Sequence, residues 1–203
     1  KTVIDNALLE NACSQLSHLY HMQFNYAEAL DVALKGLHIA ENSRIADERT
    51  YMGVASGYYK LNDTLQTIKY AESAIECIEK KGISSANADV VASAMGKFAS
   101  FGYQERAALC HRLLEQLPDS SKPFNYLTNL AVYYELHISV DTAAMLRLER
   151  YRTTSCIEDK YDATRWLVQY YYAIGDYEKA SEYAIKFISA NRDLIDKRDF
   201  EHT

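Results

Sequence analysis

The stretch that decides the fold lies near the C-terminus and reads Trp166-Leu167-Val168-Gln169-Tyr170-Tyr171-Tyr172-Ala173-Ile174-Gly175-Asp176-Tyr177-Glu178-Lys179-Ala180. Leu167, Tyr171 and Ile174 recur at the i, i+4 and i+7 spacing of one helix face. Beyond the glycine, the same spacing recurs in Ala180, Ala184 and Phe187. Gly175 favours the left-handed conformation that ends a helix. The stretch therefore predicts two packed helices joined by a tight turn.

Weaker copies of this pattern recur upstream at a nearly constant interval. If Asn25, Asp63, Tyr103, Ser139 and Asp176 are equivalent turn positions, the intervals between them are 38, 40, 36 and 37 residues. We therefore expect helix pairs with turns near residues 23–25, 61–63, 101–103, 136–140 and 174–176, and no sheet.

The pattern resembles the tetratricopeptide repeat (TPR), a pair of helices whose packing positions match Leu167-Val168, Tyr171, Gly175-Asp176-Tyr177 and Ala180. The interval exceeds the 34 residues of the standard repeat, three of the five turns lack glycine, and Pro118 and Pro123 are the only prolines. The resemblance implies an all-α superhelical solenoid of about five helix pairs. It would form one repeat domain over residues 1–203, with units near 4–41, 44–81, 86–118, 122–153 and 157–190, and a capping or continuing helix at 191–203.

Composition narrows the possible partners. The 203 residues carry a net charge of -6 and contain no long basic run, so the segment has no feature that would attract a phosphate backbone. No run of about 18 uncharged apolar residues is present, so we expect no membrane insertion by this segment. The four cysteines show no CxxC spacing, and we expect most of them to be buried thiols.

Candidate catalytic and metal sites are few. His18 and His21 share a helix face but lack a third ligand at suitable spacing, so we interpret them as groove-lining residues rather than a metal site. Cys110 and the next residue point about 100° apart on a helix and do not share a proton. The stretch Arg147-Leu148-Glu149-Arg150-Tyr151-Arg152 reads as a solvated helix face, with a contact patch as the alternative. We expect no enzyme activity, cofactor or metal.

The resemblance also assigns a binding surface, since the first helix of each TPR lines a concave face. The positions carried over are Asn11, Gln15, His18, Arg49, Met52, Tyr59, Asn125, Asn129, Arg165, Trp166, Gln169 and Tyr172, together with Ser14, Ser56, Asp89, Thr128 and Asp162. Trp166 and Tyr172 would be aromatic anchors, or would instead pack on an adjoining helix.

Charge on this face comes from Arg49 and Arg165, which we expect to be available to an acidic ligand. The lysine and asparagine clamp of one chaperone-binding TPR subclass is missing, because Ser14, His18 and Gly53 occupy its positions. In the third unit, the first helix presents small residues, namely Ala92, Ser93, Gly96 and Ala99.

These observations favour a non-catalytic module that binds a protein or peptide. Long, tyrosine-rich repeats and a charged trailing helix look like the sensor regions of some bacterial regulators, which precede a membrane helix and an output domain. Because the chain starts at Lys1 and is still regular at Thr203, we expect it to be part of such a longer protein. A free-standing cytoplasmic adaptor or chaperone-like scaffold is the alternative. The ligand, the oligomeric state and the choice between cytoplasm and periplasm stay open.

Overall fold

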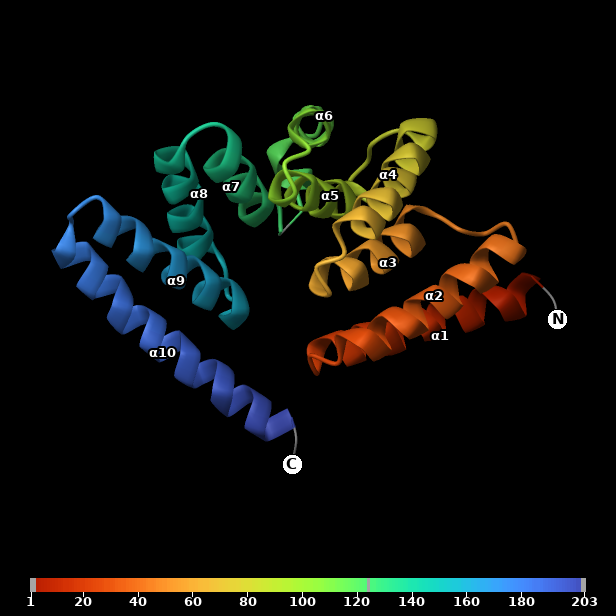
Figure 1. The fold of residues 1–203 in the computed structure, drawn as a ribbon, viewed down its shortest axis with the longest axis horizontal. Helices are drawn as coiled ribbons and strands as arrows, with labels where there is room; N and C mark the ends of the chain where they lie inside the picture. The colour runs from red at the N-terminus through yellow and green to blue at the C-terminus, as the bar shows by residue number, and fades with distance from the viewer. Residues whose placement is uncertain (1–2, 124, 202–203) are drawn as a thin grey trace. The chain divides into compact units, whose positions relative to one another are not determined.

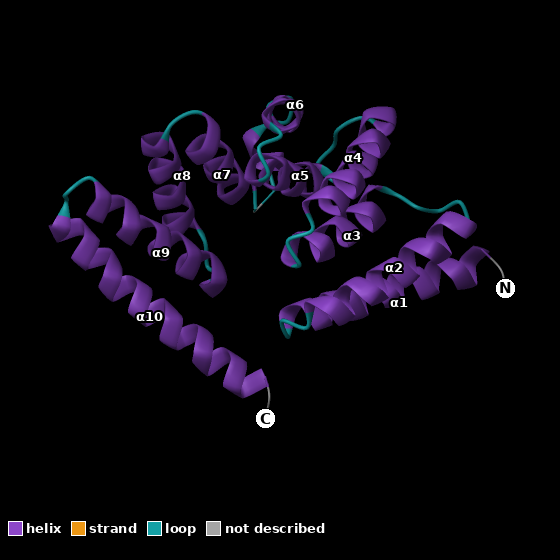
Figure 2. Ribbon diagram, viewed as in Figure 1, coloured by secondary structure: helices purple, strands orange, loops and turns teal. Residues whose placement is uncertain are grey.

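The fold consists of helices joined by short connections (Figures 1 and 2). The computed structural model describes residues 3–123 and 125–201, with all their side chains except those of residues 194 and 197–201. Within these ranges there is no strand, and the helices are α1 (Val3–Met22), α2 (Tyr26–Asn42), α3 (Glu48–Lys60), α4 (Thr64–Lys81), α5 (Ala88–Ser100), α6 (Gln104–Leu114), the 3₁₀-helix η1 (Asp119–Ser121), α7 (Tyr126–His137), α8 (Val140–Thr153), α9 (Ile157–Ala173) and α10 (Tyr177–Glu201). The all-α prediction is confirmed for this part of the chain.

The five predicted turns are also confirmed, because they fall between α1 and α2, α3 and α4, α5 and α6, α7 and α8, and α9 and α10. Gly102 and Gly175 have φ values of 80° and 81°, the left-handed conformation expected for Gly175. Phe24 and Asn62 adopt the same conformation at the equivalent place, with φ of 63° and 58°. Two of the turns without glycine therefore keep the glycine backbone geometry.

Packing divides the chain into two compact units, Lys1–Tyr126 and Leu127–Thr203, and each is described by itself. In the first unit, α1 packs against α2, α3 against α4 and α5 against α6, and α2 and α4 also contact the helices that follow them. In the second unit, α9 packs against both α8 and α10. One continuous repeat domain with the boundaries given above stays a prediction.

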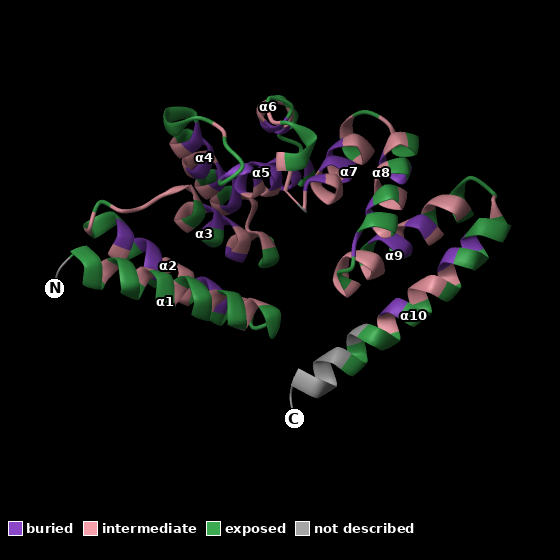
Figure 3. Cartoon of the chain, turned by 180° about the vertical axis from the view of Figure 1, so that it is seen from behind, coloured by how far each residue is buried: buried purple, intermediate pink, exposed green. Residues whose placement is uncertain are grey.

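The core of the first unit is centred on two sets of residues. Val91, Met95 and Phe98 are fully buried on α5, which is buried along most of its length (Figure 3). Leu30 and Val54 belong to a second cluster that joins α2 to α3. No residue of α1 is buried, so this helix is the exposed side of its pair.

The core of the second unit is aromatic. Leu167 and Tyr183 are buried together, and the Tyr183 ring stacks on Tyr171 with centroids 5.5 Å apart. The predicted continuing helix at 191–203 is present as α10 through Glu201, and residues 202–203 lie outside the described part of the chain.

The prediction that residues 147–152 form a solvated face of α8 is wrong for Arg147 and Arg150, whereas Glu149 and Arg152 are exposed. Arg147 pairs with Glu135 on α7, and Arg150 pairs with Asp159 on α9. Both arginine side chains are only 11% exposed. The reason is that α7 and α9 each supply a carboxylate, so the two guanidinium groups are buried as ion pairs between helices.

Candidate functional site

A hollow of about 640 Å³ lies in the first unit, on the side formed by the first helices of successive pairs. Its volume falls in the range of ligand-binding pockets, roughly 300–1,000 Å³. Most of the lining comes from α1, α3 and α5, and α2 adds two small residues. The lining residues are Glu10, Ser14, Ser17, His18, His21, Met22, Ala33, Gly36, Arg49, Thr50, Gly53, Ser56, Tyr59, Lys60, Ser93 and Lys97.

Polar contacts at both ends hold α3 and α5 side by side. Near their starts, the Arg49 guanidinium binds both carboxylate oxygens of Asp89 at 2.9 Å. Near their ends, the Tyr59 hydroxyl contacts Ser100 Oγ at 3.2 Å. Because start meets start and end meets end, the two helices run in the same direction. The floor of the hollow is therefore fixed along its length.

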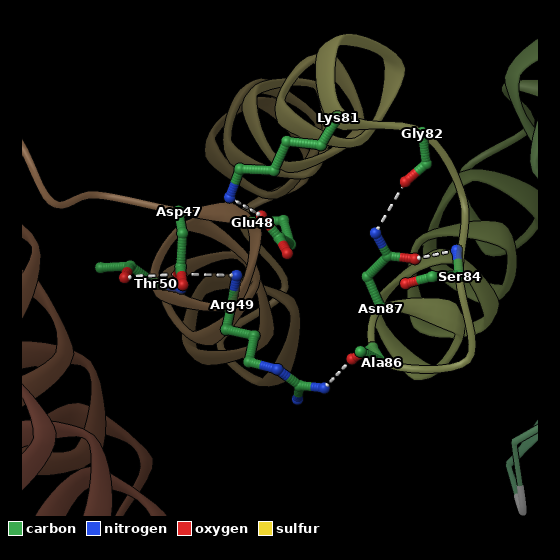
Figure 4. A network of polar contacts seen from close by, with 9 residues as sticks. All are labelled: Asp47, Glu48, Arg49, Thr50, Lys81, Gly82, Ser84, Ala86 and Asn87. Atoms are coloured by element: carbon green, nitrogen blue, oxygen red, sulfur yellow. Dashed lines mark hydrogen bonds and ion pairs between the residues drawn. The ribbon is translucent and has the colours of Figure 1, made fainter.

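The connection between α4 and α5 is tied to the start of α3 (Figure 4). Arg49 also donates to the Ala86 carbonyl, and Lys81 pairs with Glu48 at 2.7 Å. Within the connection, Asn87 Nδ2 donates to the Gly82 carbonyl at 3.0 Å, and Asn87 Oδ1 accepts from the Ser84 amide at 2.8 Å. This network sets where α5 begins.

A second hollow of about 200 Å³ adjoins the first. Both are lined by Arg49, Gly53, Ser56 and Ser93, so they form one continuous surface, which we call the groove. The second hollow adds Met52, Asp89, Val90 and Asn125 to its lining. A Cβ built on Gly53 meets nothing within 4 Å, so the groove is open above this glycine.

The two ends of the larger hollow differ in charge. At one end lies Glu10, whose carboxylate accepts from Thr50 Oγ1 at 3.5 Å. Burial, and then the charge of Asp47, raise the pKa of Glu10. At the other end are His21, Lys60 and Lys97. Ten residues separate Thr50 from Lys60 on α3, which is about 15 Å of helix.

Lys97 is a buried cation, since the residue is only 8% exposed. Its Nζ donates to Ser93 Oγ at 2.7 Å and lies 5.5 Å from the centre of the Tyr59 ring. Burial, with a smaller contribution from Lys60, lowers the pKa of Lys97 to about 8. Burial, followed by Lys60, also lowers the pKa of His21.

Solved structures with the same helix arrangement identify the fold. TPR-like repeats of a candidate kinesin light chain from Podosopora anserina align with a TM-score of 0.59 and 14% identity, over 91% of this chain and 95% of that one. A variant of the same repeat protein aligns over the same shares with a TM-score of 0.61 and 14% identity. The chain has the TPR-like repeat fold. No protein-family model and no curated protein matches the sequence.

In a TPR-like array the first helices of the repeats line one face of the solenoid, and the groove lies on that face here. Of the residues assigned from the sequence, His18 and Tyr59 line the larger hollow, Met52 and Asn125 the smaller one, and Arg49 both. Asn11 and Gln15 are exposed on α1 but lie outside both hollows. The Arg49 side chain is 55% exposed, but its guanidinium is already bound by Asp89 and the Ala86 carbonyl. Its availability to an acidic ligand stays a prediction.

In the second unit, the assigned residues lie on α7 and α9. Asn129 is half-buried on α7, and Arg165 and Gln169 are exposed on α9. Trp166 is half-buried, stacks on Tyr170 and receives the Arg147 guanidinium 4.6 Å from its ring centre, which favours the packing alternative for this residue. Tyr172 is 67% exposed and contacts the Tyr177 ring.

Sequence reasoning identified His21 as a groove-lining residue, but it missed Lys60 and Lys97, which form the rest of the basic end. It expected the first helix of the third TPR-like pair to present almost nothing but small residues. Ser93 does line the hollow, and Lys97 of the same helix lines it as well. Lys97 follows Ser93 by four residues and Asp89 by eight, so all three share one helix face. That spacing was the available signal.

The remaining chemical candidates are the cysteines and the side chains that could bind a metal. Of the four cysteines only Cys110 is buried, contrary to expectation, and burial raises the pKa of its thiol to about 12. Among the described residues, no group of three or more His, Cys, Asp or Glu side chains could hold a metal ion. The helices of this part of the chain also include none with the length and apolarity needed to cross a membrane.

Proposed function

We propose that the chain is a non-catalytic module that binds a protein or peptide, and that the groove of the first unit is its main recognition surface. The observation that carries this proposal is the hollow of about 640 Å³ on the first-helix face of a TPR-like array. Arrays of this kind present extended concave surfaces, and hollowed surfaces with converging polar groups are where ligands bind.

The lining suits an extended segment of a partner. Hydroxyl groups of Ser14, Ser56 and Ser93 offer donors and acceptors for a peptide backbone. Tyr59 offers apolar area and is held in place by Ser100 and by the Phe101 ring, whereas Met52 lines the smaller hollow but is only 6% exposed. A rigid aromatic residue surrounded by polar groups is typical of positions that dominate binding energy.

The exposed α9 residues form a second proposed contact surface. Arg165, Gln169 and Tyr172 project from the first helix of the last pair and are accessible. Trp166 supports this surface by packing beneath it against Arg147. Three further polar residues stay part of the proposal as positions at the margins of the two surfaces. They are Asn11 and Gln15, which are exposed on α1, and Asn129, which is half-buried on α7.

The finer proposal is that this module is the recognition region of a longer bacterial regulator. Its support is the analogy with long, tyrosine-rich repeats that precede a membrane helix and an output domain. A free-standing adaptor is the alternative. The complete reading frame of the gene decides between them, since a membrane helix and an output domain after residue 203 favour the regulator.

Gly53 provides a clean test of the groove, because a side chain added there enters open space. A random dodecapeptide library displayed on phage is selected on the wild-type protein. The selected peptides are then measured against Gly53→Trp, which fills the groove, and Gly53→Ala, which leaves it open. We expect Gly53→Trp to weaken binding by tenfold or more, on the order of 1.4 kcal/mol, and Gly53→Ala to retain it.

Circular dichroism controls for the helix content of both variants. Selected peptides that bind Gly53→Trp as tightly as the wild type would place recognition elsewhere. The same peptides are then tested on Tyr172→Ala, which probes the second surface.

A further inference from the structure

The basic end of the groove contains a buried cation, Lys97, for which the described residues supply no counter-ion. Neither Lys97 nor Lys60 forms an ion pair with a carboxylate in the described part of the chain. Their other close partners are the Tyr59 ring for Lys97 and the Tyr26 ring, 5.7 Å away, for Lys60. A buried charge is normally paired, because removing it from water is costly.

Helix geometry explains only part of this arrangement. His21, Lys60 and Lys97 each lie in the last turn of a helix, where a cation interacts favourably with the helix dipole. That interaction does not require burial, and Lys60 keeps it while exposed. The dipole therefore accounts for a basic residue at this position but not for one buried beside an open hollow.

Lys97 also has donor capacity left. An ammonium group carries three N–H donors, and one of them is used by Ser93 Oγ. The side chain lines the larger hollow, so a ligand in the groove can reach it. The acidic residue of the hollow, Glu10, is associated with Asp47 and Thr50 at the opposite end of α3. Arg49 also lines that end, but it is paired with Asp89. A negative group of a ligand would therefore be attracted to the end that contains Lys97 and Lys60.

We propose, on the basis that the groove binds a peptide as argued above, that its basic end selects a carboxylate of that peptide and that Lys97 is the residue that binds it. The carboxylate comes either from an acidic side chain or from the peptide C-terminus. This site is distinct from the TPR clamp positions, which Ser14, His18 and Gly53 occupy here.

Three N-acetylated hexapeptides separate the sources of the carboxylate. Hexaglutamate amide carries side-chain carboxylates only, hexaglutamine with a free C-terminus carries the terminal carboxylate only, and hexaglutamine amide carries neither. Their affinities are measured by calorimetry at pH 7 and low salt, on the wild type, Lys97→Met and Lys97→Gln. Lys80→Met is the matched control, because Lys80 is exposed on α4 and lines neither hollow.

We expect the wild type to bind one of the acidic probes at least about tenfold more tightly than hexaglutamine amide. Both Lys97 variants should remove this preference, and Lys80→Met should change it by less than about twofold. Which acidic probe is preferred identifies the source of the carboxylate.

Equal affinity for the three probes overturns the proposal, and so does a preference that both Lys97 variants retain. Failure of the proposed function would look different. If the library-selected peptides fail to bind Gly53→Trp but bind Lys97→Met normally, the groove is the peptide site and only the proposal that Lys97 binds a carboxylate is refuted. If the selected peptides bind Gly53→Trp as well as the wild type, the proposal that the groove is the peptide-binding site is refuted.

Discussion

Lys97→Met is the substitution for which the structure gives the sharpest stability prediction. Methionine has a similar length, is apolar and is a good helix former, so it can occupy the same buried space on α5. The variant loses the bond to Ser93 and the contact with the Tyr59 ring. It also loses the unfavourable burial of a charge. These two effects respond differently to pH.

The pH-dependent part follows from the pKa of Lys97, which is 10.5 for an ordinary lysine and about 8 in the folded protein. Between these two values the unfolded chain binds more protons than the folded one, so wild-type stability rises with pH across this window. Below about pH 8 the full penalty is present. At roughly 1.36 kcal/mol per pH unit, the penalty amounts to about 3 kcal/mol. The lost contacts contribute an offset of about 1–2 kcal/mol that is present at neutral pH.

We therefore expect the free energy of unfolding of Lys97→Met, minus that of the wild type, to fall by about 3 kcal/mol between pH 7 and pH 11. The assay is urea denaturation followed by circular dichroism at intervals of one pH unit. Lys80→Met should show no such trend. A difference that stays constant from pH 7 to pH 11 would refute the view that Lys97 is buried as a charge.

Three further predictions concern packing and the second surface. Gly53→Ala should stabilise the protein by up to about 1 kcal/mol, because alanine has the higher helix propensity and its Cβ enters open space. Gly57→Ala should destabilise it by about 1–3 kcal/mol, because the new Cβ would lie 3.0–3.3 Å from a leucine of α2. Urea denaturation measures both changes. Arg150→Ala should lower the free energy of unfolding by about 2 kcal/mol, with little dependence on salt, because it leaves the half-buried Asp159 carboxylate with the Thr154 hydroxyl but without its ion-pair partner. Trp166→Ala should lower the free energy of unfolding by about 2 kcal/mol, and Tyr172→Ala, at an exposed position, by less than about 0.5 kcal/mol. Each variant should weaken the binding of a partner to the second surface by about 2 kcal/mol. Denaturation measures the effect on stability and calorimetry the effect on binding.

Each of these predictions has an outcome that contradicts it. A Gly57→Ala protein as stable as the wild type would mean that α2 and α3 can separate at little cost. If Arg150→Ala destabilised the protein strongly at low salt but not at high salt, the ion pair between Arg150 and Asp159 would be exposed to solvent. If Trp166→Ala and Tyr172→Ala fold and bind the partner with unchanged affinity, the proposal of a second contact surface on α9 is refuted.

The sequence determined the helices and the turns because these depend on neighbouring residues. Gly175 and Asp176 mark a turn by their own backbone preferences, and the spacing of Leu167 and Tyr171 defines a helix face without reference to the rest of the chain. Repetition of that local pattern was enough to place all five turns. Of the residues assigned to the first-helix face, His18 and Tyr59 line the groove, and the binding role of this face stays a prediction.

Only the tertiary structure decided which charges are free and which are buried. Arg49 is bound by Asp89, forty residues later, and Arg150 by a carboxylate on the next helix. Neither pairing follows from helical periodicity. Lys97 reads from sequence as an ordinary surface lysine in the last turn of a helix. It becomes a buried cation beside a hollow because α3 packs along α5 and brings Tyr59 and Lys60 to its side, and burial of a charge is a property of the assembled helices rather than of any one of them.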